Sequence, residues 1–111
     1  MSNEFILKAQ DNQGRSITLN LKQWEHIILK RPWMWQHLDK IKRAIEEPEM
    51  ILKGSKDELM ALKGFHELLG GSSLVVVYRA ENKKGFIITA FPTKRVDRLY
   101  KSREVVWRQK K

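Results

Sequence analysis

The sequence contains no cysteine among its 111 residues. A disulfide framework and a thiolate metal site are therefore both excluded. No apolar run approaches the ~20 residues that a membrane-spanning helix needs. Residues 1–4 lack the charged and apolar regions of a signal peptide. We therefore expect a cytoplasmic protein with no membrane partner.

The sequence also lacks the common catalytic and cofactor motifs. Its three histidines, His26, His37 and His66, are far apart and share no His-x₃-His spacing. The carboxylates are scattered, whereas a two-metal nuclease needs them clustered around the ions. There is no glycine-rich phosphate loop and no nucleophile motif. We therefore expect no metal site and no cofactor, and any catalysis would use His, Arg, Lys, Thr and Tyr.

The charge is of one dominant sign, with a net value of +9 and a pI near 10.0. Residues 94–111 carry eight Lys or Arg against two acidic residues, and residues 22–43 carry six against two. Clustered positive charge of this kind is typical of proteins that bind nucleic acid. We therefore expect RNA or another polyanion as the partner, with an anionic membrane as the weaker alternative.

A chain of this length predicts one domain over residues 1–111. Residues 73–93 have the form of a β-hairpin, with two apolar strands around a short polar loop. Leu74 to Val77 are apolar without alternation, which predicts a strand covered on both faces. Strict alternation in the second strand would separate Phe86, Ile88 and Ala90 from Ile87, Thr89, Phe91 and Thr93.

A second hairpin is predicted for residues 4–9 and 15–21, with Asp11-Asn12-Gln13-Gly14 as its turn. Asn20 is the expected N-cap of a helix over 21–31. In that helix Lys22, His26 and Lys30 share the face opposite the apolar stripe. A surface histidine with no special role and a proton-transfer group are both open interpretations of His26.

Pro32 separates this helix from a second amphipathic helix over 33–47, whose stripe is Met34, Leu38, Ile41 and Ile45. Trp33 and Trp35 cannot both join the stripe. An exposed tryptophan could stack on a base, or it could pack under a loop. Residues 49–54 and 58–65 are expected to form two more strands. A basic stretch follows residue 93 and could turn helical, and residues 105–107 could form a final edge strand.

The predicted order of elements gives an α+β fold. It consists of two N-terminal helices packed on an antiparallel sheet of about four strands, together with an N-terminal hairpin.

Several of these segments resemble the phage- and toxin-associated branch of the Barnase–EndoU–colicin–RelE ribonuclease superfamily. The matching segments are Trp24-Glu25-His26-Ile27, Arg31-Pro32, Leu38 to Ile45 with Pro48, residues 74–79 and residues 85–91. The resemblance covers about residues 22–93. It implies a small α+β fold and metal-independent cleavage of RNA through its own 2′-OH. It also implies a toxin setting, with an acidic antitoxin or immunity protein as partner.

The resemblance implies that His26, Arg31 and Thr89 are catalytic, with Thr93 beside them. From charge and position we expect RNA binding by a wider set: Lys22, Lys30, Arg79, Thr93, Lys94, Arg95 and Arg98. The predicted function is a metal-independent endoribonuclease, acting with or without the ribosome. The alternative is a non-catalytic RNA- or ribosome-binding module.

Overall fold

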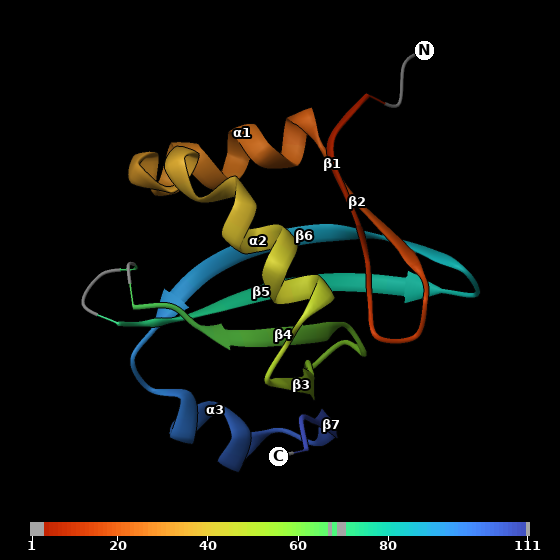
Figure 1. Cartoon of the computed structure of the whole chain (residues 1–111), viewed down its shortest axis with the longest axis vertical. Helices are drawn as coiled ribbons and strands as arrows, with labels where there is room; N and C mark the ends of the chain where they lie inside the picture. Colours follow the sequence, from red (N-terminus) through yellow and green to blue (C-terminus); the bar gives the residue numbers. More distant parts are fainter. Residues whose placement is uncertain (1–3, 67, 69–70, 111) are drawn as a thin grey trace.

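The computed structural model describes residues 4–66, 68 and 71–110 (Figure 1). Helices occupy the stretch between the second and third strands, and one more helix precedes the last strand. In chain order the elements are β1 (Phe5–Gln10), β2 (Ser16–Asn20), α1 (Leu21–Lys30), the 3₁₀ helix η1 (Pro32–His37), α2 (Leu38–Glu46), β3 (Met50–Lys53), β4 (Leu59–Gly64), β5 (Ser73–Glu81), β6 (Lys84–Thr93), α3 (Val96–Ser102) and β7 (Val105–Arg108).

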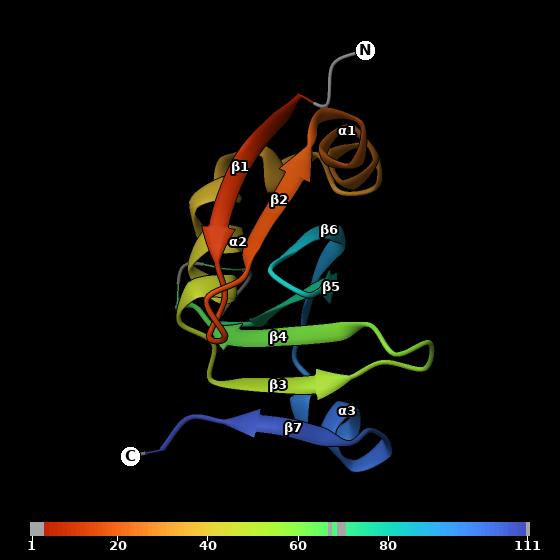
Figure 2. The ribbon, with the colours of Figure 1, turned by 90° about the vertical axis from the view of Figure 1, so that its right-hand side faces the viewer.

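All seven strands of the described chain lie in one sheet, in the order β1-β2-β6-β5-β4-β3-β7. Neighbouring strands are antiparallel, except that β2 and β6 pair in parallel over residues 16–18 and 84–86. Figure 2 shows β4, β3 and β7 side by side, with the β1–β2 hairpin running at a steep angle to them.

The expectation of two helices on an antiparallel sheet of about four strands, with a separate N-terminal hairpin, is wrong. The described residues form three α-helices and a seven-stranded mixed sheet. A sheet of only β6, β5, β4 and β3 would leave free N–H and C=O groups along the outer edges of β6 and β3. An added strand can satisfy these groups. The hairpin strand β2 pairs with β6, and the C-terminal strand β7 pairs with β3.

Both faces of the sheet are buried at β5, as the unbroken apolar run predicted. Leu74, Val76 and Tyr78 pack on one face with Ile41 and Ile45 of α2. On the other face Val75 and Val77 belong to a second, smaller core, and Val96 and Leu99 of α3 pack against it. We call these two surfaces the α2 face and the α3 face.

The expected alternation along β6 is wrong in its second half. The pairing shifts register between Val77 and Tyr78, whose partners are Thr89 and Ile87, so Ile88 is an extra residue in the ladder. Such a bulge lets two successive side chains lie on the same side of a strand. Ile88 therefore packs in the smaller core with Phe91, while Ala90 and Ile87 belong to the larger one.

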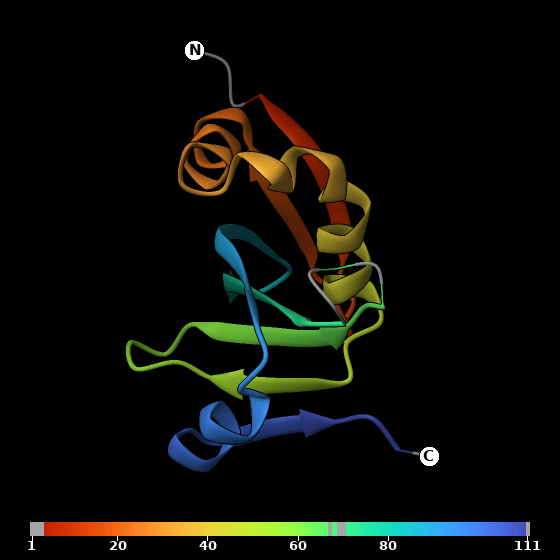
Figure 3. The same cartoon turned by 90° about the vertical axis from the view of Figure 1, so that its left-hand side faces the viewer.

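Helix α1 lies along the part of the β6 edge that β2 does not reach (Figure 3). The side-chain amide of Gln23 donates to the carbonyl of Ile88 at 2.6 Å and satisfies an edge acceptor there. The predicted N-cap is confirmed, because the Asn20 side chain accepts from the Gln23 backbone N–H at 2.8 Å. The hydrogen bond of Asn20 thus fixes where α1 begins, and that of Gln23 fixes how α1 lies against β6.

The predicted turn at residues 11–14 is anchored to the centre of the sheet. Asp11 is only 5% exposed, and its carboxylate accepts from Arg15 Nε at 2.9 Å and from the Tyr78 hydroxyl at 3.4 Å. Tyr78 is fully buried. Burial, followed by the charge of Asp11, raises the pKa of Tyr78 well above its ordinary value of 10.0.

The raised pKa of Tyr78 predicts a loss of stability at alkaline pH. Above about pH 10 the unfolded state loses the phenol proton while the folded state keeps it, so the free energy of unfolding falls with pH. The slope from this group is about 1.4 kcal/mol per pH unit. Urea unfolding on either side of pH 10 should show this slope in wild type and lose it in Tyr78→Phe. Tyr100→Phe is the control and should keep the slope.

A second prediction concerns two glycines that both lie in strands. A Cβ at Gly85 would collide with the backbone carbonyl of Arg79 and lie 2.8 Å from Ala80 Cα, whereas the nearest atoms to a Cβ at Gly64 are 3.7 Å away. Gly85→Ala should therefore lower the free energy of unfolding by about 2–3 kcal/mol. Gly64→Ala should change it by less than about 1 kcal/mol, with a gain as the expected sign. Equal effects in denaturant titrations would contradict the close approach at Gly85.

Candidate functional site

The α3 face carries a line of half-buried side chains along β6. Thr89, Phe91 and Thr93 share this face because they pair with Val77, Val75 and Ser73 of β5. Thr93 also has a local role, since its hydroxyl oxygen accepts from the backbone N–H of Arg95 at 3.0 Å. This hydrogen bond shapes the turn between β6 and α3, a role that the sequence did not indicate.

Arg31 joins the end of α1 to this line. Its backbone N–H donates to the carbonyl of Ile27 at 3.0 Å, and Pro32 then begins η1. The Arg31 guanidinium carbon lies 5.9 Å from the centre of the Phe91 ring, within the range of a cation–π contact. The structure therefore brings Arg31 onto the strand that carries Thr89 and Thr93.

His26 lies on the side of α1 that is turned away from the core. Trp24 and Ile27 pack toward the larger core, and Gln23 contacts the edge of β6. Each step of three residues turns a helix back by about 60°, so His26 lies further round from the core than Gln23 does. His26 and Lys30 are both exposed.

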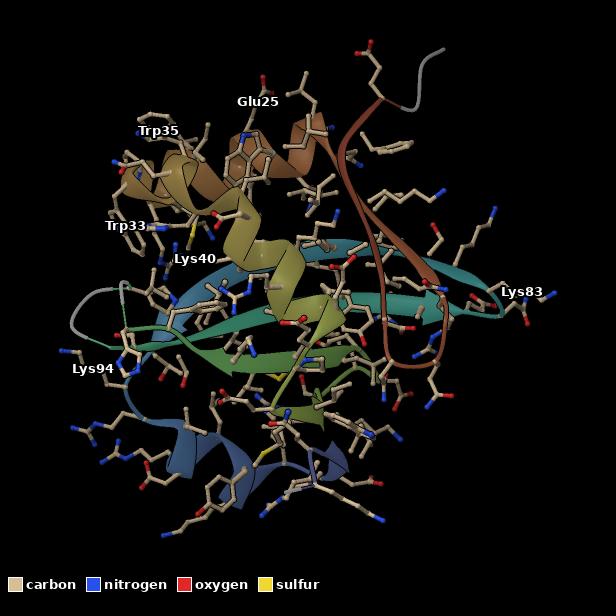
Figure 4. All side chains as sticks on the ribbon, viewed as in Figure 1. Glu25, Trp33, Trp35, Lys40, Lys83 and Lys94 are labelled. Atoms are coloured by element: carbon tan, nitrogen blue, oxygen red, sulfur yellow. The ribbon has the colours of Figure 1, made fainter. Side chains whose placement is uncertain are left out.

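The remaining predicted cations divide into two groups. Lys94, Arg95 and Arg98 are exposed at the start of α3, and Figure 4 shows Lys94 on the same side of the molecule as Trp33 and Trp35. Lys22 and Arg79 instead line an open groove of about 1120 Å³ between the start of α1 and the tip of the β5–β6 hairpin.

That groove is separate from the predicted catalytic residues. His26, Arg31 and Thr89 all lie in the described part of the chain, and none of them lines the groove. Arg31 contacts Phe91, which shares the α3 face with Thr89, whereas His26 is exposed on α1. The RNA-binding residues predicted from charge thus fall into two separate groups.

Two contacts of the candidate site could not be predicted from the sequence. The Arg31 guanidinium lies over the Phe91 ring, and Gln23 holds α1 against β6 through Ile88. The two residues of each pair are about sixty or more positions apart in the sequence, so neither partner could be inferred. Trp35 is 65% exposed, whereas Trp33 packs against the larger core, so the two tryptophans do separate.

Among residues 4–66, 68 and 71–110, no group of three or more His, Asp or Glu side chains is arranged to hold a metal ion. No helix in the same part of the chain is long and apolar enough to cross a membrane. Comparisons with protein-family models, with curated proteins and with solved structures give no match. The resemblance to ribonucleases therefore stays a prediction from the sequence.

The Arg31–Phe91 contact predicts a measurable coupling. Arg31→Ala should lower the free energy of unfolding by about 0.5–1 kcal/mol, as expected for a partly exposed cation–π pair. Lys30→Ala, at the exposed neighbouring position, should change it by less than about 0.5 kcal/mol. A double-mutant cycle with Phe91→Leu should show that the losses at Arg31 and Phe91 are not additive. Simple additivity would contradict the contact.

Proposed function

We propose that this protein is a metal-independent endoribonuclease that binds RNA on the α3 face and cleaves it by attack of the 2′-OH. The observation that carries the proposal is the Arg31–Phe91 contact. It brings a guanidinium, which suits phosphate, to the strand face that carries Thr89, and the helix α1 that ends at Arg31 also carries the exposed His26. A base, a cation and a hydroxyl donor are the groups that this reaction needs.

The charge distribution supports RNA as the substrate. The net charge is +9, and exposed lysines and arginines border the α3 face at the end of α1 and the start of α3. Phosphate neutralisation by such residues supplies most of the non-specific affinity for nucleic acid. RNA is proposed over DNA because RNA carries its own nucleophile, the 2′-OH, next to each scissile phosphate.

In the proposed reaction His26 removes the proton from the 2′-OH. The 2′-oxygen then forms a bond to phosphorus while the bond to the 5′-oxygen breaks. Arg31 binds the phosphate, and the Thr89 hydroxyl donates to a non-bridging oxygen. Solvent, which reaches this exposed site, protonates the departing 5′-oxygen. The products are a 2′,3′-cyclic phosphate and a 5′-hydroxyl end.

The proposal includes a setting, which rests on the sequence resemblance. The protein would act in the cytoplasm as a toxin and be neutralised by an acidic antitoxin or immunity protein. The second candidate is a non-catalytic RNA- or ribosome-binding module. It is favoured by Trp35, whose indole ring is 65% exposed and available to stack on a base.

Replacing His26 tests the catalytic proposal. His26→Ala should reduce cleavage of total RNA in EDTA by about 10²–10⁴-fold, because a proton-transfer group contributes about that much. Its affinity for RNA should stay within a few-fold. Its stability should change by less than about 0.5 kcal/mol, since the side chain is exposed.

The matched control is His66→Ala, which removes another exposed histidine and should cleave at the wild-type rate. Cleavage by His26→Ala at the wild-type rate would contradict the mechanism. RNA binding by a wild type that leaves every RNA intact would favour the second candidate.

A further inference from the structure

A row of side chains crosses the α3 face next to Thr89, near the tip of the β5–β6 hairpin. Arg79 pairs with Phe86, two residues along β5 from the Val77–Thr89 pair. Glu58 precedes Leu59, which pairs with Tyr78, so Glu58 lies beside Arg79. The next members are Gly54, whose backbone N–H donates to the Glu58 carbonyl at 2.6 Å, and then Arg103. We call this set the Arg79 row: Arg103, Gly54, Glu58, Arg79 and Phe86.

Arg103 joins the row through β7. The backbone N–H of Lys53 donates to the Glu104 carbonyl at 2.9 Å, and Leu52 pairs with Val105. Arg103 therefore lies beside Gly54, two residues before Val105 on the same face. Its Nε is buried and has no hydrogen-bond partner among the described residues. A buried guanidinium N–H without a partner is a donor that a phosphate oxygen can satisfy.

Glu58 lies between the two arginines. Its carboxylate accepts from the Lys56 backbone N–H at 2.7 Å, and its side chain occupies the space above Gly54. Hydrogen bonds from its own and the Lys56 backbone amide lower the pKa of Glu58, and the charges of Arg79 and Arg103 lower it further. The carboxylate is therefore ionised at neutral pH and lies within the electrostatic range of both guanidinium groups.

Phe86 adds a flat apolar surface at the end of the row. It is 48% exposed, which is unusual for a phenylalanine in the middle of a sheet, and it lies directly beside Arg79. Proteins that bind single strands combine such exposed rings with nearby cations, because a base stacks on the ring while a cation holds the phosphate. Neighbouring positions on the same face of a strand are about 6.8 Å apart. The Arg79–Phe86 pair is therefore the next same-face pair after Val77–Thr89.

We propose that the Arg79 row is a nucleotide subsite for single-stranded RNA, in which Phe86 stacks on a base and Arg79 and Arg103 contact separate phosphates of the backbone. The subsite rests on the proposed function, because it takes the nucleotide next to the one held at Thr89. It also requires an unpaired strand, since a base inside a duplex has no free face for Phe86.

Arg79 and Phe86 also line the open groove described above. The rest of its lining contains the carboxylates of Glu4, Glu25, Asp57 and Glu81 against the two basic residues Lys22 and Lys84. These carboxylates repel a phosphate backbone, so we expect the strand to contact the groove only at its Arg79–Phe86 border. Phe5 lines the same groove and is 51% exposed, which makes it a matched control for Phe86.

Binding of 2′-O-methyl oligonucleotides, which lack the nucleophile, tests the subsite by fluorescence anisotropy. Phe86→Leu should weaken an octanucleotide by about tenfold, as expected for one lost stack. Phe86→Tyr should restore the affinity, and Phe5→Leu should leave it unchanged. Arg103→Gln should reduce the salt slope of octanucleotide binding by about 0.7, whereas Arg108→Gln should not.

The subsite is contradicted if Phe86→Leu has no effect, if Phe5→Leu weakens binding equally, or if wild type does not bind the octanucleotide. Equal losses at the two phenylalanines would show that the RNA runs through the groove and does not stop at Phe86. Thermal unfolding of each variant separates lost binding from lost folding, and Phe86→Tyr keeps the test valid if Phe86→Leu unfolds. Normal binding with no cleavage of natural RNA would contradict the nuclease and still support the subsite.

Discussion

The outer edge of β6 is closed by two different elements, and the candidate site depends on how they divide it. Strand β2 pairs with residues 84–86, and α1 covers the next part of the edge through the Gln23–Ile88 hydrogen bond. A helix beside a strand edge satisfies far fewer backbone groups than a strand does, but its side chains can cross the edge. The end of α1 can therefore extend Arg31 over Phe91, which a pairing strand would not allow.

The bulge at Ile88 complements this arrangement. By adding one residue to β6, it changes which side chains share a face, so that Phe86, Thr89 and Phe91 all lie on the α3 face. The same face carries Arg79 near the hairpin tip and α3 at the other end. Apolar packing at Val75 and Val77 thus supports a surface whose border is basic. Core packing and the proposed recognition of RNA therefore share this face, because Thr89 and Phe91 pair directly with Val77 and Val75.

The sequence allowed the local elements to be predicted but not their distant pairing. Asn20 as a helix cap, the turn at residues 11–14 and the doubly covered strand at 74–77 follow from short-range rules. The parallel pairing of β2 with β6 does not, because nothing in residues 16–18 specifies residues 84–86 as partners. The Ile88 bulge was also missed, since alternation is assumed until a register is known. Of the candidate site, the residues His26, Arg31 and Thr89 could be proposed from the sequence, while the Phe91 platform needed the fold.

The separation of paired segments along the chain has a consequence during synthesis. Strands β3, β4, β5 and β6 pair with their neighbours in sequence, whereas β2 and Asp11 contact residues that follow about 67 positions later. Contacts that close long loops form late in folding, and a nascent chain emerges from its N-terminus. The hairpin and α1 therefore leave the ribosome without their partners, and Arg31 meets Phe91 only after residue 91 has emerged. A nascent chain cannot form the Arg31–Phe91 contact before that point, so the candidate site is assembled only after its helix has been free of the ribosome for about sixty further residues of synthesis.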